Sequence, residues 1–95
     1  MIRADDLIKH VVDAFGITVK TLHTGDKSRR YFYCRCALAN LLRAAGYSLH
    51  QIGDIVNRNH STIAYYMRVH GILMGQVDSY RENFIKCRNK LKIEE

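Results

Sequence analysis

The sequence lacks proline, long apolar runs and the N-terminal pattern of a signal peptide, and each absence narrows the class of protein that we expect. Without proline, and with most glycines between apolar periodic segments, the pattern favours helices joined by short turns over a sheet. No window approaches the roughly 18 consecutive apolar residues of a membrane span, so we exclude one. The first residues are acidic where a signal peptide needs basic charge and then an apolar run. We therefore expect a soluble, cytoplasmic protein with no membrane partner.

The sequence also lacks the spacings of a metal site or a catalytic centre. Its three cysteines are an odd number, which indicates reduced thiols when no secretion signal is present. Cys34 and Cys36 would point in different directions on a helix, and no two histidines have the H-x₃-H spacing. Neither paired carboxylates nor a nucleophile with a base is evident. We therefore expect no metal or other cofactor, no small-molecule substrate and no enzyme activity.

The chain has 95 residues, a length that suits a single domain over residues 1–95. Its net charge of +6 lies entirely in the middle of the sequence. The two flanks together hold equal numbers of acidic and basic residues. Asp54 is the only acid between residues 27 and 68, and the basic residues there are Lys27, Arg29, Arg30, Arg35, Arg43, Arg58 and Arg68. A basic middle between neutral ends indicates a surface for a polyanion, with a merely solvated basic surface as the alternative.

Apolar periodicity predicts an all-α fold of about five helices. Asp5 or Asp6 would cap the first helix, and Gly16 and Gly46 would end the first and the second. The segment over residues 17–26 would form a turn and a loop. We expect the helices over residues 6–15, 30–45, 49–56, 60–73 and 76–92.

Residues 48–66 match a helix-turn-helix, in which a short helix and a tight polar turn precede a second helix. Ser48 and Gln51 have the S-x-x-Q spacing of a capping box, and Gly53 would permit the close approach of two crossing helices. The first turn of the second helix corresponds to the part of a recognition helix that meets DNA. Five consecutive residues that can hydrogen-bond stand there: Arg58, Asn59, His60, Ser61 and Thr62. A cap alone would need only Asn59 or Ser61, so the run favours DNA recognition over capping.

Three segments carry a family resemblance. They are Arg35, Ala37, Leu41 and Arg43, then Ser48-Leu49 with Ile52-Gly53, then Arg58-Asn59-His60-Ser61-Thr62-Ile63. In these residues the chain, over about residues 6–73, resembles the C-terminal duplex-binding domain of DnaA, the bacterial replication initiator, and it adds a helix at 76–92. The resemblance implies an all-helical domain that recognises DnaA-box-like sites in replication initiation or its regulation. Since the chain has no G-x-x-x-x-G-K-[ST] phosphate loop, we expect no ATPase activity.

The resemblance also assigns the expected contacts with double-stranded DNA. Base edges in the major groove would be read by Asn59, His60, Ser61 and Thr62, with Thr62 suited to a thymine methyl group. The basic loop, which carries Lys27, Arg29 and Arg30, would enter the neighbouring minor groove. Arg35 would lie against the DNA backbone. The expected phosphate and minor-groove contacts are Lys27, Arg29, Arg30, Arg35, Arg58 and Arg68.

Three differences from the family pattern predict an altered recognition site. Asn59 stands where the family has an acid that can accept from a cytosine amino group, whereas asparagine also donates and pairs best with adenine. The turn after Val56 is one residue shorter than in the family. The loop that begins at Asp26 is less densely basic, which predicts weaker anchoring in the minor groove.

The last predicted helix supports an alternative, a small protein-interaction module or transcriptional regulator. Its apolar stripe would either pack on the domain or form a seam with a partner, so we expect a monomer or a weak homodimer. The stripe consists of Val77, Tyr80, Phe84, Cys87 and Leu91.

Overall fold

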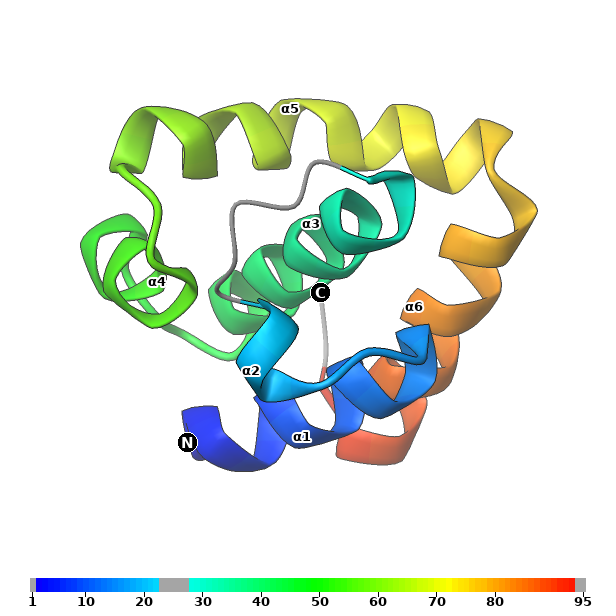
Figure 1. The fold of residues 1–95 in the computed structure, drawn as a ribbon, viewed down its shortest axis with the longest axis horizontal. Helices are drawn as coiled ribbons and strands as arrows, with labels where there is room; N and C mark the ends of the chain where they lie inside the picture. The colour runs from blue at the N-terminus through cyan, green and yellow to red at the C-terminus, as the bar shows by residue number, and fades with distance from the viewer. Residues whose placement is uncertain (1, 23–27, 94–95) are drawn as a thin grey trace.

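The computed structural model describes residues 2–22 and 28–93, and it is all-helical over these ranges (Figure 1). This confirms the predicted fold class, with six helices in the described residues instead of about five. The helices are α1 (Ala4–Phe15), α2 (Val19–Leu22), α3 (Arg29–Ala44), α4 (Leu49–Val56), α5 (His60–Gln76) and α6 (Asp78–Leu91).

The additional helix, α2, lies in the segment that was predicted to be a turn and a loop. It is a single turn, so it is too short to show an apolar period. The side chains of Thr18 and Thr21 each accept a hydrogen bond from the other residue's backbone N–H, at 3.2 and 3.1 Å. The turn buries Leu22 completely. Local threonine bonds and one buried side chain therefore form this helix.

The first helix begins earlier than its predicted cap. Its N-cap is Arg3, which makes no capping hydrogen bond through its side chain. Asp5 and Asp6 lie inside the first turn, where a negative charge favours the positive end of the helix dipole, so their prediction as caps was wrong. Gly16 ends the helix, as predicted, and it adopts the left-handed conformation at φ 71°.

The central helix is α3, which passes between α1 on one side and α5 on the other (Figure 1). It packs against each of the other helices. All three cysteines are buried free thiols. Burial raises the pKa of the Cys34 thiol to about 12 and that of the Cys36 thiol to about 11. The buried residues of α3 are Cys34, Arg35, Cys36, Ala37, Leu38, Ala39, Leu41 and Leu42.

The last helix packs on the rest of the protein through its apolar stripe. It contacts α1, α5 and α3. Tyr80, Phe84 and Cys87 are buried, and the Tyr80 hydroxyl lies 2.8 Å from Nδ1 of His70 on α5. Of the two predicted arrangements for this stripe, the structure contains the packed one. No helix in the described residues is long and apolar enough to cross a membrane.

Candidate nucleic-acid interface

The helices α4 and α5 form the predicted helix-turn-helix, and local hydrogen bonds set both ends of α4. The capping box is present: the Ser48 N–H donates to Gln51 Oε1 at 2.8 Å, and the Gln51 N–H donates to Ser48 Oγ at 3.2 Å. At the other end, Asn57 adopts the left-handed conformation with φ 58°, a conformation that asparagine tolerates better than most residues. The helix therefore covers the predicted residues, 49–56.

The turn between the two helices closes tightly on Gly53. The backbone N–H groups of Asn57 and Arg58 both donate to the Gly53 carbonyl, the latter at 2.9 Å. A Cβ atom on Gly53 would lie 2.7 Å from the Arg58 carbonyl oxygen, which is closer than real Cβ contacts come. Gly53 does permit a close approach, but the prediction that two crossing helices make this approach was wrong. The close neighbour is the backbone of the turn.

The first turn of α5 is exposed and carries the predicted base-reading residues. Asn59 is the N-cap, since its Oδ1 accepts a hydrogen bond from the Thr62 N–H at 2.9 Å. Asn59, His60 and Ser61 are exposed, and Thr62 is half-buried. The structure therefore brings these four side chains together at one helix end, where backbone N–H groups and the helix dipole attract anions.

A histidine from α4 lies beside this turn and was missed by the sequence analysis. The ring of His50 is 5.3 Å from the ring of His60 between centroids, and both residues are exposed. His50 follows the capping serine by two positions, and no motif distinguishes it from any other exposed residue. Only the packing of α4 against α5 places it at the interface.

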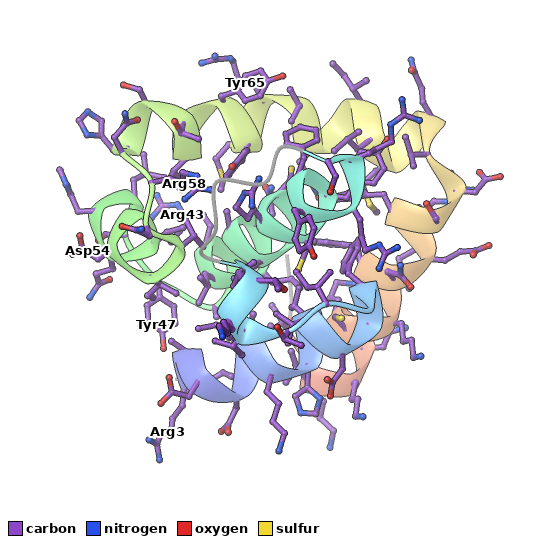
Figure 2. All side chains as sticks on the ribbon, in the orientation of Figure 1. Arg3, Arg43, Tyr47, Asp54, Arg58 and Tyr65 are labelled. Atoms are coloured by element: carbon purple, nitrogen blue, oxygen red, sulfur yellow. The ribbon has the colours of Figure 1, made fainter. Side chains whose placement is uncertain are left out.

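Hydrogen bonds near the middle of α5 hold this helix against α3. The Tyr66 carbonyl accepts hydrogen bonds from Asn40 Nδ2 at 3.2 Å and from Cys36 Sγ at 3.3 Å. With Tyr66 held against α3, the opposite side of α5 faces solvent, and Tyr65 projects from it (Figure 2). The exposed residues at helical spacing on this side are Ser61, Tyr65, Arg68 and Ile72.

Arg35 is buried and does not present its guanidinium to solvent. Only 4% of the residue is exposed. Its Nε donates to the Tyr66 hydroxyl and its Nη1 to the Leu22 carbonyl, both at 3.4 Å. The structure therefore places Arg35 as a link between α2, α3 and α5, and not on the surface where the sequence analysis expected it. The cause is tertiary, because its acceptors are 13 and 31 residues away.

The other predicted cations lie on α3, in the turn before α5 and on α5. Arg29 and Arg30 are exposed in the first turn of α3, and Arg30 Nη1 donates to the Gly16 carbonyl at 3.4 Å. Arg68 is exposed, with its guanidinium carbon 5.8 Å from the centre of the Tyr65 ring. Arg58 is half-buried, and its Nη1 donates to the Asn57 carbonyl at 2.8 Å. Lys27 lies outside the described residues.

This arrangement defines a helix-turn-helix protein. It consists of the short helix α4, a three-residue turn and the longer helix α5 with its polar first turn. The family model described as the bacterial dnaA protein helix-turn-helix matches residues 4–69, which is more than half of the chain. The chain therefore belongs to this family, as the sequence resemblance indicated. The match ends within α5, so α6 lies beyond it. Among curated proteins, none matches the chain.

Proposed function

We propose that the protein binds double-stranded DNA sequence-specifically, with the first turn of α5 in the major groove. Asn59, His60, Ser61 and Thr62 would read base edges there, Thr62 through a thymine methyl group. The observation that carries the proposal is the polar first turn, in which Asn59, His60 and Ser61 are exposed while the nearby Ile63 is completely buried. A base-reading turn must be accessible and yet anchored to the protein, and the buried Ile63 provides this anchor.

Phosphate contacts would come from the exposed cations Arg29, Arg30 and Arg68, with Lys27, and from Arg58 at the turn. Arg29 lines a hollow with Phe32 and Leu73, so it lies beside the C-terminal half of α5. From His60 to Leu73 the helix rises about 20 Å. Half of the ~34 Å repeat of duplex DNA is about 17 Å. With the axis of α5 along the duplex, this spacing would allow the first turn of α5 in one groove and Arg29 at the adjacent groove.

Arg35 would have a different role from the one first expected. Because its guanidinium is buried and bonded to Tyr66 and Leu22, we assign it to the support of α5. A phosphate contact would require it to leave both acceptors and to expose part of the core. Its effect on DNA binding would therefore be indirect, through the orientation of α5.

Family membership supports DnaA-box-like sites, in replication initiation or its regulation, as the biological targets. The chain would recognise such a site and would not hydrolyse a nucleotide. The alternative, a partner surface on the last helix, has less support, since Tyr80, Phe84 and Cys87 are buried against the protein. We therefore favour DNA as the principal partner.

Fluorescence anisotropy with two labelled duplexes tests the proposal. One duplex carries a DnaA-type box and the other the same bases scrambled, and each is titrated across a series of salt concentrations. The five proposed phosphate contacts would give a slope of log K against log salt of roughly −4.5. A preference of about 10³-fold or more for the box would establish specific recognition. Absence of binding to either duplex at low salt would refute the proposal.

A further inference from the structure

The amide group of Asn59 has a fixed orientation at the start of α5. Its Oδ1 accepts the Thr62 N–H at 2.9 Å. The opposite orientation of the amide would place the two N–H bonds of Nδ2 against the Thr62 N–H, donor against donor. The cap therefore determines which atom is oxygen and which is nitrogen, and it directs the oxygen toward the helix backbone.

The nitrogen of the same amide is available to a ligand. Since Oδ1 and Nδ2 lie on different sides of Cγ, Nδ2 points away from the Thr62 N–H. It has no hydrogen-bond partner among the residues that the structure describes, and Asn59 is exposed. Asn59 thus presents a hydrogen-bond donor outward while its acceptor serves the helix.

We infer that Asn59 selects a base that itself offers a hydrogen-bond acceptor in the major groove and discriminates against cytosine at that position. This inference rests on the proposed function. Guanine offers O6 and N7, thymine offers O4 and adenine offers N7, whereas cytosine offers only its amino donor. Guanine has two adjacent acceptors and is the preferred partner for an amide nitrogen. The bidentate pairing of asparagine with adenine is disfavoured, because it would draw Oδ1 away from its cap.

Two substitutions at this position separate base reading from capping. Asn59→Asp keeps one oxygen for the cap and turns a second acceptor outward, so it should invert the preference toward cytosine. Asn59→Ser keeps a capping oxygen but removes the amide donor, so it should weaken the discrimination. Asn57→Asp is the matched control, since it makes the same charge change two residues away at a position that also tolerates aspartate.

The test is a set of duplexes in which each position of the bound site carries each of the four base pairs in turn. At one position the wild type should bind the cytosine duplex about 5- to 150-fold more weakly than the guanine duplex. Asn59→Asp should reverse the order at that position alone, and Asn59→Ser should flatten it. Asn57→Asp should lower the affinity for all duplexes by a similar factor. Thermal melting of each variant confirms that the cap and the fold are retained.

The outcomes distinguish this inference from the proposed function. If the wild type prefers certain sequences, but Asn59→Asp and Asn57→Asp both lower affinity uniformly, DNA binding stands and the role of Asn59 is overturned. The role is also overturned if cytosine is the preferred base at the position where Asn59→Asp changes the profile. If the wild type binds no duplex, the proposed function fails and this inference fails with it.

Discussion

Replacement of Gly53 by alanine tests whether the close turn between α4 and α5 determines the structure of the helix-turn-helix. The new Cβ would lie 2.7 Å from the Arg58 carbonyl oxygen, about 0.7 Å closer than the 3.4 Å at which ordinary contact begins. That oxygen belongs to the backbone of the turn, so no flexible side chain can move aside. The turn would have to open, which would strain or break the Arg58 N–H bond to the Gly53 carbonyl.

Two opposing effects decide the magnitude for Gly53→Ala. Alanine in place of glycine favours a helix by about 1 kcal/mol. Overpacking in a well-packed site costs about 1–3 kcal/mol, and loss of the hydrogen bond costs about 1 kcal/mol more. We expect a net loss of about 1–3 kcal/mol in the free energy of unfolding, and weaker binding to the box because the first turn of α5 moves.

Gly71→Ala is the matched control, since it makes the same chemical change inside an exposed part of α5. A Cβ on Gly71 would meet nothing within 4 Å, so no packing cost opposes the better helix propensity of alanine. The free energy of unfolding should therefore rise by up to about 1 kcal/mol. Urea denaturation monitored by circular dichroism measures the free energy of unfolding of both variants, and fluorescence anisotropy measures their DNA binding. Equal stabilisation by both substitutions would refute the argument that the turn excludes a side chain at residue 53.

Further substitutions and a pH series test the interface and the core. His60→Ala should cost about 1–3 kcal/mol on the preferred duplex and little on scrambled DNA, and equal losses on both would contradict base reading. Arg29→Ala should weaken both duplexes alike and flatten the salt slope by about one unit, whereas an unchanged slope would remove Arg29 from the phosphate contacts. Arg35→Met should lower the stability by about 1–3 kcal/mol without changing that slope, because it removes buried bonds and no phosphate contact; a flatter slope would restore the phosphate role. Burial raises the pKa of Cys34 from 9.0 to about 12, so the folded state retains a proton that the unfolded state loses, and stability should fall as pH rises from 9 toward 12. Urea midpoints across that range should fall less in a Cys34→Ala variant than in the wild type, and identical pH dependence would contradict this reasoning.

Features that depend on neighbouring residues were predictable from the sequence. The capping box of Ser48 and Gln51, the end of α1 at Gly16 and the bounds of α4 were all predicted, because a few adjacent residues specify each. The polar first turn of α5 was predicted for the same reason, since Arg58 to Thr62 are consecutive. The positions of other helix ends were less well specified: α5 continues through Gly71 and Gly75 to Gln76, beyond the predicted end near residue 73. An isolated glycine weakens a helix without ending it when packing supports the helix.

The amino-acid sequence alone determines that the described part of the chain is all-helical, where its helix-turn-helix lies and which polar residues begin the second helix. These properties follow from periodicity, capping and composition, which act over a few positions. The tertiary structure alone decides that Arg35 is inside, that His50 lies beside His60, and that Gly53 contacts the carbonyl of the turn. Each of these three properties depends on the path of the backbone or on atoms from another element. The backbone path and those contacts are determined only when the helices pack.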